Sequence, residues 1–158
     1  MTNASLSRLF LVFLAFVVIL YGAYVRLTDA GLGCPDWPGC YGKLVVSELD
    51  DPNFSFAPGT DYGKAYREMV HRYLAGILGL GIFGLFIHYW VNEGKRTLFS
   101  SETILLPMVL FQAFLGLLTV TMLLKPLIVT GHLIGGFMTL SLLWWSFLRN
   151  NFELAHET

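Results

Sequence analysis

Four long uncharged stretches decide what this chain can fold into. They are rich in Leu, Ile, Val and Phe and span residues 9–25, 73–92, 103–124 and 126–148. A helix rises about 1.5 Å per residue, so about 20 apolar residues cross a hydrocarbon layer of about 30 Å. None of the stretches shows the alternation of a barrel strand. The sequence therefore predicts four transmembrane helices.

The composition supports a membrane protein. Of 158 residues, 55% are hydrophobic and only 13% are charged, whereas a soluble domain usually carries about 25% charged residues. A chain of this size has too little interior to bury so many apolar side chains from water. The net charge of -1 offers no attraction for nucleic acid. We therefore expect membrane lipid, and no nucleic acid, around this protein.

The connections between the stretches predict the topology. Two are short, so neighbouring helices run antiparallel, and we expect the first stretch to be a retained helix rather than a cleaved signal peptide. The predicted fold is an all-α membrane protein, an antiparallel four-helix bundle with a long outer loop between the first two helices. We expect one haem-binding domain over 1–158, with spans at about 9–26, 68–91, 103–124 and 127–148 and the loop at about 27–66.

Two cysteines orient the predicted bundle, because the basic residues do not. The counts at the two ends are almost equal: Arg8, Lys95, Arg96 and Arg149 at one end, and Arg26, Lys43, Lys64, Arg67 and Lys125 at the other. Cys34 and Cys40, the only cysteines, both lie in the long loop. They would form a disulfide, which persists outside the cytosol, or stay free thiols in a cytosolic loop. We expect the disulfide, which places the loop outside and both termini in the cytoplasm.

Two histidines lie at similar depths in two predicted helices. His71 begins the second helix, in EMVHRYLAG, and His132 lies in GHLIGG near the start of the fourth. Both are within about 10 Å of the outer boundary, at about 1.5 Å per residue. Ionisable side chains inside a membrane are costly and usually functional, and two imidazoles can bind the two faces of a haem iron. We interpret the pair as iron ligands; the alternative is that each forms a hydrogen bond across the bundle.

Three charged residues near this pair have two interpretations each. Glu68 precedes His71 by three residues, so both share a helical face; it would move protons beside a haem or be an exposed residue favoured by the helix dipole. Arg26 and Arg72 would bind haem propionates or reach lipid headgroups. His88, beside two aromatic residues, is interpreted as an interfacial residue rather than a ligand.

A weak internal similarity relates the two halves of the chain. GAYVRLT, at 22–28, ends the first stretch, and GLLTVT, at 116–121, lies near the end of the third. His71 and His132 then follow in the second and fourth stretches. This pattern predicts that helices one and two are repeated as helices three and four, an arrangement that often places a site between repeats. Gln112, in the third stretch, is expected to hydrogen-bond across the bundle.

Four segments together resemble the haem A synthase family. They are GAYVRLTDAGLGCPDWPGCYGK, EMVHRYLAGILG, FQAFLGLLTVT and TGHLIGGFMTL, and the similarity extends from about Tyr21 to Trp145. The resemblance implies an oxidoreductase that oxidises a methyl group of haem O to the formyl group of haem A. Successive hydroxylations and loss of water would produce the haem A that terminal oxidases use.

The matching positions imply roles for five residues. They are His71 and His132 as ligands of the haem iron, Glu68 as the essential carboxylate, and Cys34 with Cys40 as the loop pair. The bound cofactor or substrate would be haem b or haem O, and electrons would leave to an unidentified acceptor. Haem O synthase and terminal oxidase assembly proteins are the partners that the resemblance suggests, in the cytoplasmic membrane of a prokaryote.

Members of this family usually contain two similar four-helix halves, and this chain resembles the amino-terminal one. We therefore expect a homo-oligomer that rebuilds an eight-helix unit. Three other functions stay open. A non-catalytic bis-histidine cytochrome or haem-holding assembly subunit needs only His71 and His132. A thiol oxidoreductase usually needs a closer cysteine pair, and a structural subunit without a cofactor leaves the histidines unexplained.

Overall fold

The computed structural model describes residues 3–92 and 100–157 and consists of helices and loops. The helices are α1 (Asn3–Leu27), α2 (Tyr62–Asn92), α3 (Ser101–Thr121) and α4 (Pro126–Glu157), with the short 3-10 helix η1 (Val46–Leu49) in the long loop. These ranges contain no strand, only an isolated bridge between Cys40 and Lys43. The all-α prediction is confirmed. Lys95 and Arg96, used above to compare the two ends, lie outside the described residues.

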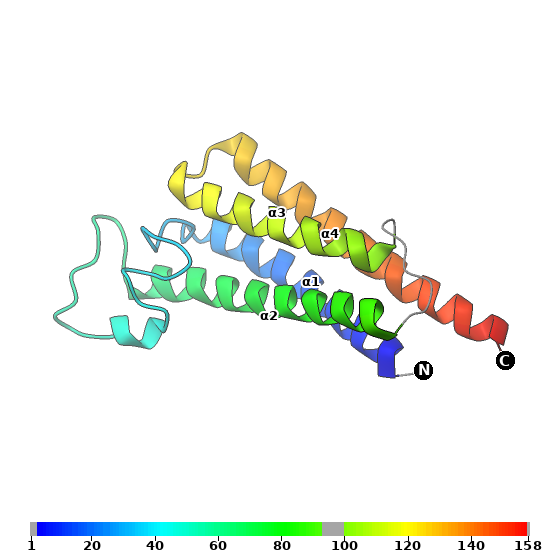
Figure 1. Ribbon diagram of the computed structural model, residues 1–158. Coiled ribbons are helices and arrows are strands. Elements are labelled where there is room, and N and C mark those ends of the chain that lie inside the picture. Colours follow the sequence, from blue (N-terminus) through cyan, green and yellow to red (C-terminus); the bar gives the residue numbers. More distant parts are fainter. Residues whose placement is uncertain (1–2, 93–99, 158) are drawn as a thin grey trace.

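The four helices form a ring in which each packs against two others. α1 and α3 each pack against both α2 and α4, whereas α2 and α4 face each other diagonally and do not pack directly along their described residues. Figure 1 shows the long loop and the α3–α4 turn at one end of the bundle, here called the loop end. Both chain termini lie at the opposite end, here called the terminal end. The predicted antiparallel four-helix bundle is therefore confirmed.

Local sequence signals fix the ends of α3 and the start of α4. The Ser100 side chain accepts a hydrogen bond from the Thr103 amide at 3.2 Å, which caps α3. Leu123 and Leu124 then adopt positive φ angles of 51° and 55°, which reverse the chain within a few residues. Pro126 opens α4, a position that suits proline because the first helical amides have no intrahelical partner.

All four helices are long and apolar enough to cross a membrane, and the protein is an integral membrane protein. Large apolar side chains on the outside of the bundle are exposed, including Phe13, Leu80 and Trp145. In lipid such side chains need no protein cover, because the solvent itself is apolar. α2 and α4 also extend beyond their expected spans, since α2 begins at Tyr62 and α4 continues past residue 148.

The apolar interior is divided into two clusters. The bundle cluster fills the terminal half and contains Leu11, Leu14, Ala15, Leu78, Ile82, Leu85, Leu105 and Leu143. The loop cluster lies under the long loop and contains Cys34, Cys40, Val46, Leu49, Ala65 and Met69. In α2, His71 lies between Met69 of the loop cluster and Leu78 of the bundle cluster. The predicted iron ligand therefore lies where the two apolar clusters meet.

A buried polar network joins three helices at the terminal end. Arg8 of α1 and Glu102 of α3 are 3% and 5% exposed and form an ion pair of 3.1 Å. Ser146 of α4 accepts a hydrogen bond from Arg8 at 3.0 Å and donates one to Glu102 at 2.7 Å. Arg8 also donates to Asn150 at 3.1 Å. Arg8 is thus a buried, neutralised charge rather than an exposed residue at the end of a span.

Candidate haem site

His71 lies against the main chain of α1. A Cβ atom built on Gly22 would be 2.8 Å from Cε1 of His71 and 3.4 Å from both ring nitrogens. A real Cβ does not come so close to another heavy atom, so any side chain at position 22 would displace the imidazole. Gly22, which opens the repeated segment of the first helix, therefore creates the space in which His71 lies.

His132 repeats this arrangement in the second half of the chain. A Cβ atom on Gly116 of α3 would lie 3.6 Å from Cε1 of His132. In both halves the histidine of the second helix therefore approaches a glycine of the first helix with the same ring atom. The internal similarity between 22–28 and 116–121 thus corresponds to a structural equivalence between the two halves.

The two histidines lie on the diagonal pair of helices, α2 and α4, near the loop end. The Nδ1 atoms of both rings are buried and have no hydrogen-bond partner among the residues that the structure describes. Among the described side chains, which cover residues 3–92 and 100–152, no three His, Cys, Asp or Glu gather to hold a bare ion. A porphyrin supplies four equatorial nitrogens and requires only axial ligands from the protein. The pair therefore fits a haem better than a bare metal ion.

Glu68 is buried and fully engaged. Its Oε1 atom accepts a hydrogen bond from Nη2 of Arg72 at 2.5 Å, and its Oε2 atom accepts one from the Cys34 amide at 2.9 Å. Only 5% of the residue is exposed. Because Glu68 precedes His71 by three residues, it lies one helical turn closer to the loop. The sequence alone left a buried and an exposed Glu68 equally open, and the structure places it inside.

Arg72 fastens the loop to α2. Its Nη1 atom donates to the carbonyl oxygens of Asp36, at 2.8 Å, and of Gly39. The same residue forms the ion pair with Glu68. In this conformation the Arg72 guanidinium is committed to the loop, which differs from both expected roles, propionate binding and contact with lipid headgroups.

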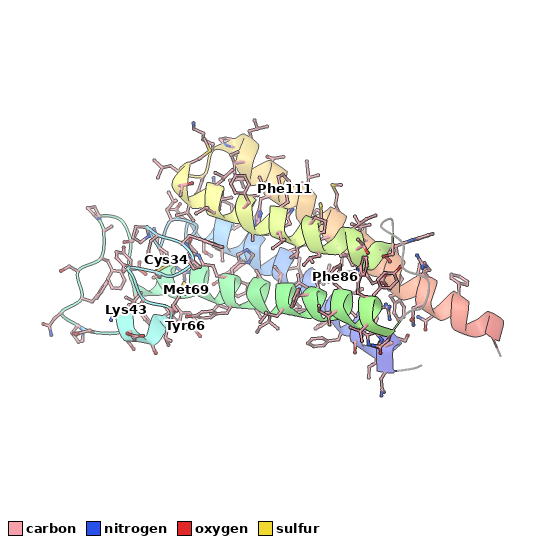
Figure 2. All side chains as sticks on the ribbon, viewed as in Figure 1. Cys34, Lys43, Tyr66, Met69, Phe86 and Phe111 are labelled. Atoms are coloured by element: carbon pink, nitrogen blue, oxygen red, sulfur yellow. A yellow bond between two sulfur atoms is a disulfide. The ribbon has the colours of Figure 1, made fainter. Side chains whose placement is uncertain are left out.

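A disulfide closes the segment that Arg72 and Glu68 hold. Cys34 and Cys40 are bonded, with their Cα atoms 4.8 Å apart, and both residues are completely buried. Figure 2 shows Cys34 beside Met69 at the loop end, where the loop folds back over the start of α2. Glu68 therefore contacts the disulfide segment directly, through the Cys34 amide.

Arg26 and Arg67, two arginines near the site, differ in how far they are buried. Arg26 is exposed at the end of α1. Arg67, which was not predicted as a site residue, is partly buried, and its Nε atom has no hydrogen-bond partner within the described part of the chain. Arg67 precedes His71 by four residues, so it lies on the same helical face, one turn closer to the loop. The spacing of four was the sequence signal that would have identified it.

Among the described residues, the side-chain Nε2 atom of Gln112 does not donate the hydrogen bond that was expected across the bundle. The residue is 9% exposed, and its Nε2 atom is buried. The amide lies against Gly135 of α4, where a Cβ atom would overlap it. His88, by contrast, is exposed and lies 3.0 Å from the Asn92 side chain, which agrees with an interfacial residue.

Comparison with known proteins places this chain in a family. The family model COX15-CtaA, described as cytochrome oxidase assembly protein, matches residues 7–157. The chain belongs to this family. It is 44% identical over 153 residues to the haem A synthase of Shewanella oneidensis, a match that covers 91% of this chain. A second relative, the haem A synthase of Orientia tsutsugamushi, is 26% identical over 149 residues and 92% of this chain. The resemblance inferred from the sequence is confirmed.

The matches cover only part of each relative. They span 44% of the Shewanella protein and 40% of the Orientia protein, so the chain spans less than half the length of these relatives. A shorter segment, 45% of the chain, is 32% identical to 10% of the protohaem IX farnesyltransferase of Thermus thermophilus. No solved structure matches the chain significantly.

Proposed function

We propose that this protein binds haem O between α2 and α4, with His71 and His132 as iron ligands, and takes part in its oxidation to haem A. The observation that carries the proposal is the pair of equivalent histidines on diagonal helices, each against a glycine and each with an unpartnered, buried Nδ1 atom. Membership of the COX15-CtaA family and the similarity to two haem A synthases support it. On this proposal residues 1–158 form one four-helix haem-binding unit.

The residues around the histidines would have different roles, depending on how far each lies from the loop. A bound haem would supply the iron redox chemistry. His71 and His132 would hold the iron, and Arg67, one turn outward, would pair with a propionate because its Nε atom is unpartnered. Arg26 is the second candidate for the propionates, since it is exposed at the same end. Arg72 would contribute only after releasing the loop carbonyls.

Glu68 would accept protons close to the reacting methyl group. A carboxylate in a water-poor site is an effective general base when a proton must leave. In the conformation described here it is held by Arg72 and by the Cys34 amide, so the proposal requires that one of these contacts loosen when haem O binds. With water as the oxygen source, conversion of a methyl to a formyl group releases four electrons and four protons. An external electron acceptor is therefore part of the proposal.

The loop disulfide supports a proposed location in the cell and a proposed orientation in the membrane. A buried disulfide suits a compartment outside the cytosol, so we place the loop end outside the cytoplasmic membrane of a prokaryote, with both termini in the cytoplasm. A haem O synthase would supply the substrate, and the similarity to a protohaem IX farnesyltransferase supports a link to that reaction. Assembly of a terminal oxidase would consume the product. Self-association stays a prediction, and the mass of the detergent-solubilised protein measures it.

The test combines spectroscopy with product analysis. Purified protein loaded with haem O should show a bis-histidine absorption spectrum, and cells supplied with haem O should accumulate haem A. His71→Ala and His132→Ala should each abolish the bis-histidine spectrum while the helix content measured by circular dichroism is retained. An unchanged spectrum in either variant would contradict the proposed ligands. Haem O that persists in cells with folded, loaded protein would contradict the oxidation.

A second function, a non-catalytic haem-holding subunit, is favoured by the engagement of Glu68. Both of its carboxylate oxygens hold the loop, a role that needs no chemistry. Glu68→Gln distinguishes the two functions, because glutamine has nearly the same shape but is a much weaker base. For a catalytic role we expect at least a tenfold loss of haem A formation, about 1.4 kcal/mol, with haem binding retained. If haem A formation is unchanged, the holding function is favoured.

A further inference from the structure

Gln112 is a buried polar side chain that the proposed chemistry does not use. It is 9% exposed, and its Nε2 atom has no hydrogen-bond partner in the described part of the chain. A buried amide without a partner is unfavourable, because it has lost its hydrogen bonds to water. Gly135 on the facing helix provides the space that the amide occupies. Such a costly group, with space reserved for it, indicates a ligand that would complete its hydrogen bonds.

The position of Gln112 relative to the iron ligands is defined by two glycines. Gln112 lies one turn before Gly116, against which His132 packs, and it contacts Gly135, one turn after His132. α3 runs towards the loop end and α4 runs away from it. Both relations therefore place the amide one turn deeper in the bundle than His132, on the side away from the loop.

The other half of the chain shows that packing alone does not require a polar group here. The equivalence of Gly22 with Gly116 and of His71 with His132 aligns Val18 with Gln112, and Leu74 with Gly135. Val18 and Leu74 are both partly buried and pack against the bundle cluster. An apolar pair thus occupies this level in the first half, whereas an amide and a glycine occupy it in the second half.

The charges at the loop end orient the ligand. Arg26, at the end of α1, and Arg67, near the start of α2, lie at that end, so the two propionates of a haem would lie there. In haem O the hydroxyl group of the farnesylated substituent stands on the edge of the macrocycle opposite the propionates. With the propionates at the loop end, that edge would face into the bundle, towards the level of Gln112.

We propose that the Gln112 amide hydrogen-bonds this hydroxyl group and makes the site select haem O over protohaem, which has a vinyl group there. The inference rests on the proposed function, because it requires a haem between His71 and His132. A site built to hydrogen-bond a substrate hydroxyl discriminates against an analogue that lacks it, because the polar group of the site is then left unpaired.

The experiment titrates purified protein with haem O and, separately, with protohaem, and follows the Soret absorption. Gln112→Leu should weaken haem O binding about tenfold and leave protohaem binding unchanged or tighter. Thr139→Val is the matched control, because this hydroxyl is also buried in the bundle but bonds within its own helix, to the Gly135 carbonyl at 2.9 Å. The control should leave the ratio of the two affinities unchanged.

The outcomes separate this inference from the function on which it rests. If Gln112→Leu weakens the binding of both haems equally, so that the ratio of the two affinities is unchanged, the inference is overturned. The proposal that the protein binds haem would then still stand. If wild-type protein binds neither haem, the proposed function itself fails. Gln112→Met, which keeps the length of the side chain, replaces the leucine variant if the latter does not fold, and the same change in ratio is expected.

Discussion

Each end of the bundle contains an arginine–glutamate ion pair that is largely shielded from solvent, and the two pairs differ in what they join. At the terminal end, Arg8 and Glu102 connect α1 with α3, and Ser146 and Asn150 of α4 complete the network. At the loop end, Glu68 and Arg72 belong to the same helix and hold a loop rather than another helix. The terminal pair joins helices of the bundle, whereas the loop pair joins α2 to the long loop.

The surroundings of the two pairs also differ, in the number of buried nitrogen atoms that have no hydrogen-bond partner in the described residues. Near the loop pair, buried nitrogens of His71, His132 and Arg67 have no hydrogen-bond partner among the described residues, and at the terminal end the same is true of Asn150 Nδ2. Polar groups buried without partners are rare in native proteins and require an explanation. The terminal end has one such atom inside a network that joins three helices, whereas the loop end has three, all on basic side chains and two of them on the predicted iron ligands, as expected of a site that a ligand completes.

The largest effect is expected from breaking the terminal pair. Arg8→Met leaves the Glu102 carboxylate buried without its cation, which costs about 3–5 kcal/mol. Thermal unfolding in detergent, followed by circular dichroism, measures the loss. The double variant Arg8→Met/Glu102→Leu should recover most of it, because an apolar pair of similar volume has no charge to bury. Equal stabilities of Arg8→Met and wild type would show that the network does not fasten the bundle.

A smaller, more local effect is expected at the loop end. Gly22→Ala places a methyl group 2.8 Å from the His71 ring, and overpacking of this kind costs about 1–3 kcal/mol. We expect haem affinity to fall about tenfold, or about 1.4 kcal/mol. Gly131→Ala is the control, because it is adjacent to His132 yet has open space around the added methyl group. If both variants bind haem equally, the glycine does not position the histidine.

The smallest effect is expected from an ion pair that belongs to neither network. Lys43 and Glu48 lie 3.1 Å apart in the long loop, and both side chains are 48% exposed. Exposed pairs contribute about 0–1 kcal/mol, so Lys43→Ala should change the free energy of unfolding by less than about 0.5 kcal/mol. The same unfolding measurement tests this. A larger loss would mean that the loop contributes to the stability of the bundle itself.

The fold could be predicted from the sequence because a bilayer permits few architectures. Uncharged stretches of the right length must be helices, and short connections make neighbouring helices antiparallel. The pairing of Cys34 with Cys40 followed from their isolation in one loop. Whether Glu68 is buried or exposed could not be predicted. A residue at the start of a helix is buried only if a distant segment, here the one that contains Cys34, folds over it.

Of the residues in the candidate site, the two histidines and Glu68 were predicted from the sequence, whereas Gly22 and Arg67 were not. His71 and His132 stand out because ionisable groups are rare in apolar stretches. Gly22 has no such signal, since glycine is common in membrane helices, and its role appears only when the facing imidazole is located. Arg8 resembled a charge at the end of a span because its partner, Glu102, lies far away in sequence.

The contact between His71 and Gly22 gives the bundle a mechanical property. Since the imidazole rests on the main chain of α1 rather than on a side chain, no rotamer lies between them to absorb movement. A tilt or slide of α1 is therefore transmitted directly to the ring. Helix tilt depends on the match between helix length and bilayer thickness, so the thickness of the surrounding membrane becomes one of the quantities that set the position of His71.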